Sequence, residues 1–250
     1  MGFIRGTACA NFPRVSQAQE FFEDFLTDEG LTGWTATQND GSGSGTGAAT
    51  AVADAVNGVV TIATNTASGA DGEWSQIQQE AETFKLGLGA KIRFACRLKL
   101  DDVTQSEFFA GLCITDTAAI GDSGAGDNVM TDFIGFTSDD GDALLDLVWD
   151  LNGTARASYN RAAALATMVD DTWMELAFEI VMDPVTAGTG VVRAWLDGKP
   201  LVLTGGSYDY YSTDMPYDEE LCVLLAVANG NTSTHTLSVD VVEATANRAS

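Results

Sequence analysis

The sequence predicts an all-β protein, a two-sheet antiparallel β-sandwich with a short N-terminal arm. Three observations support this prediction. The 250 residues include 26 glycines but only 12 Lys and Arg, and charged residues reach 19%, below the usual quarter. From about residue 57, short apolar or alternating runs are separated by Gly, Asp, Asn and Thr clusters, without helical patterns between them. The apolar share of 45% is enough for one large core.

Ten runs have the length and residue types of β-strands. They are 58–64, 73–79, 91–100, 107–115, 132–137, 143–151, 173–182, 191–196 with 200–203, 221–228 and 236–244. The dipeptide Asp197-Gly198 lies between two of these runs and tolerates positive φ, so it predicts a hairpin turn.

Strict alternation indicates which side of each strand is buried. In 173–182 one side carries Met174, Leu176, Phe178 and further apolar residues, while the other side carries Trp, Glu, Ala and Val. The run 91–100 alternates in the same way, with apolar residues on one side and mostly Lys and Arg on the other. Repeated period-2 patterns of this kind call for two antiparallel sheets packed face to face.

The first residues lack a sustained period, and we expect residues 1–19 to form an arm outside a sandwich domain of residues 20–250. The segment around Phe21 and Phe25 fits either a capped amphipathic helix or a strand that enters the sandwich. The arm carries the predicted partner-binding residues Phe3, Ile4, Arg5, Phe12 and Arg14. Apolar anchors outside the repeating pattern are expected to be buried against another subunit.

The net charge of −24 and the pI of about 4.1 bear on the partners. Such a chain repels phosphate backbones and anionic headgroups, so we expect no nucleic-acid partner and no membrane partner. The start of the chain has no apolar stretch of signal-peptide length, which predicts synthesis and retention in the cytosol. The four cysteines, Cys9, Cys96, Cys113 and Cys222, are widely spaced, and three lie in apolar runs, so inert core thiols are expected.

Short motifs follow one another through residues 20–247. They are Phe22-Glu23-Asp24-Phe25 with Gly33-Trp34, the basic alternating run 91–100, Phe108-Phe109-Ala110-Gly111-Leu112, Asp132-Phe133-Ile134-Gly135-Phe136, Trp195-Leu196-Asp197-Gly198 and Leu237-Ser238-Val239-Asp240. In this order they resemble concanavalin A-like (laminin G-like) jelly-roll domains, in particular those of structural proteins of tailed bacteriophages. The resemblance implies two sheets, one of them concave, in proteins that bind glycans, hydrolyse glycans or decorate capsids and tails.

The sequence contains no recognisable set of catalytic side chains, so the chain is predicted not to be an enzyme. Glycosidases place two carboxylates about 5 to 9.5 Å apart, whereas Glu175 and Glu179, like Asp146 and Asp150, are four residues apart on one strand, or about 13 Å. Carboxylates from two neighbouring strands remain an open alternative. The single histidine, His235, lies among polar turn residues and is expected to be exposed.

Acidic turns and a tyrosine-rich segment are the remaining candidate sites. A Gly-rich loop and a tight acidic turn offer oxygen ligands for Ca²⁺, with solvated carboxylates as the alternative. The candidate Ca²⁺ ligands are Asp122, Asp127, Asp139, Asp140 and Asp142. The candidate glycan-binding residues are Tyr208, Tyr210, Tyr211 and Tyr217, for which packing in an oligomer interface or over an open end of the sandwich is the preferred alternative.

These features predict a virion structural protein made in the host cytoplasm. The leading interpretation is a capsid decoration (cement) protein that forms a homo-oligomer and binds the major capsid protein, with no cofactor apart from the Ca²⁺ just considered. The alternatives are a carbohydrate-binding, lectin-like module and a tail or fibre component. An acidic outer surface suits the first interpretation, because like charges keep particles apart in suspension.

Overall fold

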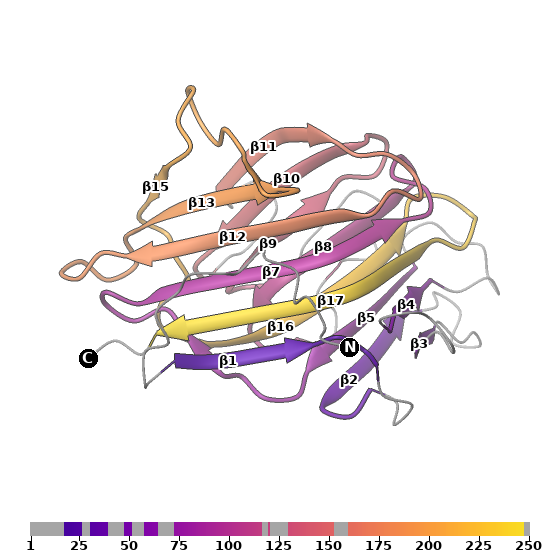
Figure 1. Ribbon diagram of the computed structural model, residues 1–250, viewed down its shortest axis with the longest axis horizontal. Helices are drawn as coiled ribbons and strands as arrows, with labels where there is room; N and C mark the ends of the chain where they lie inside the picture. Colours follow the sequence, from indigo (N-terminus) through magenta and orange to yellow (C-terminus); the bar gives the residue numbers. More distant parts are fainter. Residues whose placement is uncertain are drawn as a thin grey trace, which may run out of the picture.

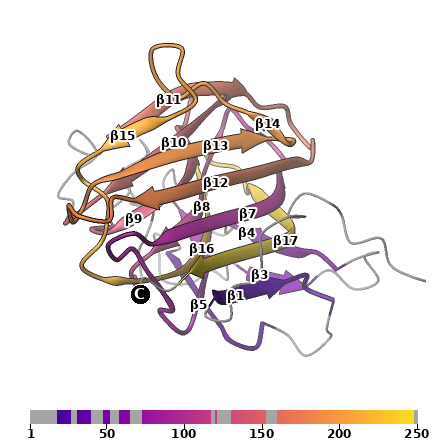
Figure 2. The same ribbon diagram turned by 60° about the vertical axis from the view of Figure 1, so that its left-hand side comes forward.

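The computed structural model describes residues 18–26, 31–39, 48–51, 58–64, 73–116, 120, 130–152 and 160–247. The strands in these ranges form two antiparallel sheets, stacked as two layers in Figures 1 and 2. The prediction of an all-β sandwich is therefore confirmed. Among the described residues, no helix is both long and apolar enough to cross a membrane.

The nine-stranded sheet has the order β14-β13-β12-β7-β17-β4-β3, with β1 paired to β17 and β15 paired to β13. Its strands are β1 (Ala18–Glu23), β3 (Ala48–Ala51), β4 (Val60–Ala63), β7 (Lys91–Leu100), β12 (Met174–Met182), β13 (Gly190–Leu196), β14 (Lys199–Pro200), β15 (Tyr210–Ser212) and β17 (Thr236–Asn247).

The eight-stranded sheet has the order β11-β10-β9-β8-β16-β5-β2, with β6 paired to β16. Its strands are β2 (Trp34–Asn39), β5 (Trp74–Gln79), β6 (Phe84–Lys85), β8 (Ser106–Cys113), β9 (Phe133–Ser138), β10 (Leu144–Asp150), β11 (Asn160–Thr167) and β16 (Glu220–Asn229). Each of the ten runs expected from the sequence contains a strand, and six further strands come from other segments.

The main core lies between the two sheets and follows the predicted alternation. In β7 every second residue, from Ile92 to Leu100, is buried, and the intervening residues are half-buried. Phe94 and Phe178 stand opposite each other in the pairing of β7 with β12, and their rings stack with centroids 5.2 Å apart. The Asp197-Gly198 turn has positive φ at both residues, 51° and 72°, so the predicted hairpin is confirmed.

The structure decides between the two forms expected for the N-terminal region, a helix or a strand. The segment that fitted a helix or a strand forms β1, which pairs with β17 from Ala18 opposite Asn247 onward. The sheet therefore begins two residues inside the predicted arm of residues 1–19, because backbone pairing to β17 continues to the end of that strand. Residues 1–17, with the proposed anchors of the arm, lie outside the described residues.

Candidate functional site

The outer face of the eight-stranded sheet carries a second, smaller apolar layer. In β10, Leu145, Leu147 and Trp149 belong to the main core, so Asp146, Val148 and Asp150 project from the opposite face. The second layer consists of Trp74, Phe109, Cys113, Ile120, Met130, Phe133, Val148, Leu224, Ala226 and Ala228. Both faces of this sheet are thus largely buried, and the carboxylates of β10 lie beside an apolar layer.

A carboxylate cluster, defined as Asp132, Asp150, Asp214 and Asp218, lies at one end of β10. Asp150 is paired with Phe133, the residue after Asp132, in the register of β9 and β10, and its carboxylate interacts electrostatically with those of Asp132 and Asp214. These two carboxylates are buried, at 7% and 2% exposure, whereas Asp214 and Asp218 are exposed. The cluster therefore has a buried pair and a rim that faces solvent.

Asn152 and Asn160 hold the cluster together from the two ends of the β10–β11 connection. The backbone N–H of Asn152 donates to Asp132 Oδ1 at 3.1 Å, and its side-chain Nδ2 donates to Asp218 Oδ2 at 3.2 Å. Asn160 Nδ2 donates to Asp214 Oδ2 at 3.4 Å. These amides fix the orientation of three of the four carboxylates.

The electrostatics of the cluster single out Asp150. Burial raises the pKa of Asp150 above its ordinary value, and the neighbouring carboxylates Asp214 and Asp132 raise it further, against a lowering by the N–H of Leu151. A carboxyl group with a raised pKa next to a second carboxylate is the arrangement that general acid–base catalysis of glycoside cleavage uses.

The separation of about 13 Å between carboxylates four residues apart on one strand argued against a catalytic pair. Asp132 lies one residue before β9, next to Phe133, which is the partner of Asp150 in the register of β9 and β10. Residue spacing within one strand does not reveal that these two carboxylates lie near each other.

Asp146, near the other end of β10, has a structural role. It forms an ion pair with Arg161 and accepts a 2.6 Å hydrogen bond from the N–H of Ala164, which has positive φ, next to an irregularity in the β10–β11 register. Arg161 also donates to Asp139 at 2.7 Å. Burial raises the pKa of Asp146, and Asp139 raises it further, while Ala164 and Arg161 act in the opposite direction.

Three of the five predicted Ca²⁺ ligands, Asp139, Asp140 and Asp142, lie within the described residues. Asp139 binds Arg161, and Asp142 Oδ1 accepts the N–H of Leu144, so both carboxylates have partners within the protein. Asp140 lies against Gly230. Across the described ranges, no group of three or more His, Cys, Asp or Glu side chains is arranged to hold a metal ion. Asp122 and Asp127 lie outside these ranges, and Ca²⁺ binding stays a prediction.

The four tyrosines do not form one surface. Tyr208 and Tyr211 are 52% and 73% exposed. Tyr210 packs edge-on against Trp149 at 4.7 Å, and Tyr217 packs against the main core. Trp149 Nε1 donates to Ser212 Oγ at 2.9 Å, which ties this segment to β10 beside the carboxylate cluster.

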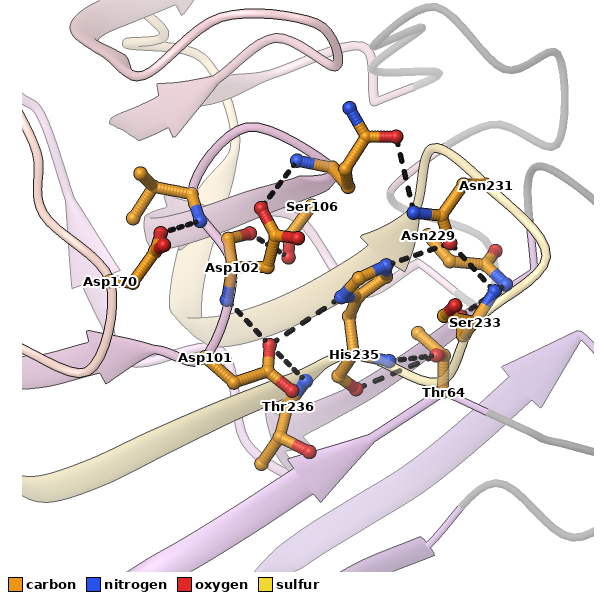
Figure 3. A network of polar contacts seen from close by, with 12 residues as sticks. Thr64, Asp101, Asp102, Ser106, Asp170, Asn229, Asn231, Ser233, His235 and Thr236 are labelled. Carbon is orange, nitrogen blue, oxygen red and sulfur yellow. Dashed lines mark hydrogen bonds and ion pairs between the residues drawn. The ribbon is translucent and has the colours of Figure 1, made fainter.

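His235 is buried, at 3% exposure, and not exposed as the sequence predicted. Figure 3 shows the reason: its ring lies between Asn231 and Asp101, with Nε2 3.0 Å from Asn231 Oδ1 and Nδ1 3.6 Å from Asp101 Oδ1. Its backbone pairs with Thr64. This polar network ties together turns at the Ser106 end of β8, whereas the carboxylate cluster lies at the Cys113 end. The role of this network is therefore structural: it holds these turns together.

The chain has the concanavalin A-like jelly-roll fold, as the resemblance implied. It is similar to an endo-β-1,4-glucuronan lyase from Trichoderma reesei, with a TM-score of 0.57, 16% identity and coverage of 90% of this chain and 94% of that one. It is also similar to an endo-1,3-β-glucanase from Streptomyces sioyaensis, with a TM-score of 0.57, 14% identity and coverage of 96% of this chain and 100% of that one. Peanut lectin matches with a TM-score of 0.54, 12% identity and coverage of 94% of this chain and 100% of that one. No protein-family model and no curated protein matches the sequence. At these identities the likeness shows the fold.

The prediction that the chain is not an enzyme is wrong. That prediction relied on the lack of a suitable carboxylate pair on one strand and left a pair from two strands open. The lyase and the glucanase are enzymes with this same sandwich fold, so the fold gives no ground for excluding enzymatic activity.

Proposed function

We propose that the chain is a carbohydrate-active enzyme that cleaves glycosidic bonds at the carboxylate cluster. The observation that carries the proposal is the buried carboxyl of Asp150, whose pKa is raised by burial and by the neighbouring carboxylates Asp214 and Asp132. The exposed Asp214, Asp218 and Asn152 offer hydrogen-bond partners for sugar hydroxyls at the rim. The fold shared with a glucanase, a glucuronan lyase and a lectin is consistent with a glycan as the ligand.

In the proposed reaction, Asp150 donates its proton to the glycosidic oxygen as the bond from that oxygen to the anomeric carbon breaks. Water adds to the anomeric carbon, and Asp132 accepts the proton that this water loses. The net charge of −24 disfavours polyanionic glycans by repulsion, so we propose a neutral polysaccharide such as a β-glucan.

The test is release of reducing ends from neutral β-1,3- and β-1,4-glucans. We expect Asp150→Asn and Asp132→Asn to reduce the rate by about 100-fold or more, because general acid and base catalysis typically contribute that much. Asp146→Asn is the matched control, since Asp146 also has a raised pKa and lies on the same strand but outside the cluster. Unchanged cleavage by Asp150→Asn protein would refute the assignment.

A second proposal concerns location on a virion. Edge strand β1 follows the segment of residues 1–17 and leaves Phe22 and Leu26 exposed, at 61% and 58%. Exposed apolar side chains beside a segment with Arg5 and Arg14 support attachment to the major capsid protein or to a tail assembly. Particles that sediment without the full-length chain, or that retain a variant lacking residues 1–17, would contradict this role for the arm.

A further inference from the structure

Cys113 and Cys222 lie directly opposite each other on neighbouring strands of the eight-stranded sheet. Cys113 is the last residue of β8, and it is paired with Cys222 of β16 in the antiparallel register. Phe109 and Leu224, on the same side of these strands, belong to the second apolar layer, so both thiols project from the outer face of the sheet. Residues opposed in this way have their Cα atoms about 4.5 to 5.5 Å apart, which lies within the range of about 4.4 to 6.8 Å found in disulfides.

The two thiols also interact with each other. Cys222 Sγ donates to the backbone oxygen of Cys113 at 3.3 Å, and Gln78 Nε2 donates to Cys113 Sγ at 3.2 Å. A hydrogen bond with the Cys113 thiol lowers the pKa of Cys222 against the effect of burial, whereas burial and the same hydrogen bond raise the pKa of Cys113. Cys222 is therefore the thiol that ionises first and attacks, and Cys113 lies beside it to complete a bridge.

Cys96 differs from this pair in its surroundings. Its thiol is also buried, but it projects from β7 into the main core. The residues opposite it on the two neighbouring strands are Leu176 and Val242. Cys96 thus has the surroundings of an inert core thiol, with no second cysteine opposite it.

Burial of the pair decides when it can react. Cys113 and Cys222 have no exposed surface in the folded chain, so an oxidant has to reach them before the sheet is complete. The two residues are 109 positions apart in sequence, and β16 is inserted between β8 and β5. Both thiols are open to solvent until β16 takes this place, and they meet as β8 and β16 pair.

We propose that Cys113 and Cys222 form a structural disulfide when the chain folds under oxidising conditions. The Cys222 thiolate attacks one sulfur of a small-molecule disulfide such as oxidised glutathione, and one glutathione leaves as a thiolate. The Cys113 thiolate then attacks the Cys222 sulfur of the mixed disulfide and releases the second glutathione. Two protein thiols are oxidised to one disulfide, oxidised glutathione is reduced to two thiols, and these take up the two protons that the cysteines lose.

The bridge would lie in the same row of the sheet as Asp150. The register places Cys113 opposite Phe133, and Phe133 opposite Asp150, so one row of side chains runs from Cys222 to Asp150. A covalent link would fix the pairing of β8 with β16 beside the strand that carries this carboxylate. Disulfides persist in secreted proteins and on virion surfaces, whereas the cytosol keeps thiols reduced. The inference goes beyond the proposed function and does not depend on it.

The experiment refolds the full-length chain from denaturant in a mixture of oxidised and reduced glutathione. Free thiols are then alkylated in denaturant, and the peptides are mapped by mass spectrometry. We expect linked peptides that contain Cys113 and Cys222. Because the bridge joins residues 109 positions apart, the Tm of the bridged protein should exceed that of the reduced protein by about 5 to 15 °C.

Two comparisons test the geometry and the route. Cys113→Ala and Cys222→Ala should each abolish the linked peptides and the dependence of Tm on oxidation. Cys96→Ala is the matched control, because it also removes a buried thiol but should preserve both results. Folded, reduced protein placed in the same glutathione mixture should stay unbridged, since neither thiol is exposed. Rapid bridging of the folded protein would refute the folding route.

The wild-type chain alone can overturn the proposal, even if a variant fails to fold. Alkylated Cys113 and Cys222 after oxidative refolding, or links to other cysteines in place of this pair, would do so. A bridge that leaves the Tm unchanged or lowers it would refute the structural role. None of these measurements uses glycan cleavage, so failure of the proposed function would leave them unaffected.

Discussion

Replacement of Arg161 by Met removes the cation that compensates two carboxylates at the start of β10. The Arg161 side chain is 30% exposed, while that of Asp146 is 1% exposed, so the variant leaves a buried carboxylate without its ion-pair partner. Asp146 keeps the hydrogen bond from the N–H of Ala164. The penalty therefore falls on the charged form of Asp146.

The expected loss is about 3 kcal/mol of the free energy of unfolding. Breaking a buried ion pair by removing one partner costs about 3 to 5 kcal/mol, and the partial exposure of Arg161 places the loss at the low end. For a domain of this size, about 3 kcal/mol corresponds to a fall in Tm of about 6 to 12 °C. Arg193→Met is the control, because the Arg193 side chain is 41% exposed and pairs with Asp209, which is 35% exposed, so this pair is worth about 1 kcal/mol or less. Its second partner, the buried Glu179, keeps its ion pair with Lys91.

The pH dependence identifies the mechanism. The pKa of Asp146 is already raised in the folded state, and loss of Arg161 raises it further. A carboxyl whose folded pKa exceeds its unfolded pKa costs stability while it is ionised, and this cost shrinks as pH falls through the folded pKa. Urea unfolding of Arg161→Met should therefore approach wild-type stability as pH is lowered from neutral through the folded pKa of Asp146.

The comparison with Asp146→Asn decides the question. In the Asp146→Asn background, Arg161→Met should cost less than it does in the wild type, because no buried charge is left behind. Equal costs in both backgrounds, or a loss that does not change between neutral and acid pH, would refute the reasoning.

Two further predictions concern packing and acid stability. Gly135→Ala places a Cβ 2.5 Å from the ring of Phe109 and 2.9 Å from the backbone oxygen of Ala110, and it should cost about 1 to 3 kcal/mol by chemical denaturation, with partial recovery when Phe109→Leu is added. Burial acts to raise the pKa of Asp101, but hydrogen bonds from His235 and the N–H groups of Thr236 and Asp102 outweigh it and hold the pKa below its ordinary value. Stability from Asp101 is therefore present above its unfolded pKa and lost as pH falls through the folded one, so the acid limb of a pH–stability curve should flatten in Asp101→Asn. An unchanged limb would contradict this.

Most of the fold was predictable because alternation reports burial on one strand at a time. The ten runs found by alternation became strands, whereas β11 escaped notice because its sequence, Asn-Arg-Ala-Ala-Ala-Leu-Ala-Thr, lacks β-branched and aromatic residues in most positions. Its strand conformation depends on pairing with β10. The candidate site was less accessible to prediction, because Asp132 and Asp150 are 18 residues apart in sequence and interact only once β9 and β10 are paired, and because His235 is buried by turns distant in sequence.

The positions of β16 and β17 have a consequence for biosynthesis. β16 lies between β8 and β5, and β17 lies between β7 and the pair β1 and β4, so the latest strands of the described chain occupy the middle of both sheets. Neither sheet is complete until these strands have left the ribosome. Until then the earlier strands have unpaired edges. Completing the sheets is slow, because it pairs strands that are distant in sequence. We therefore expect the incomplete chain to be more prone to aggregation than the full-length protein during synthesis.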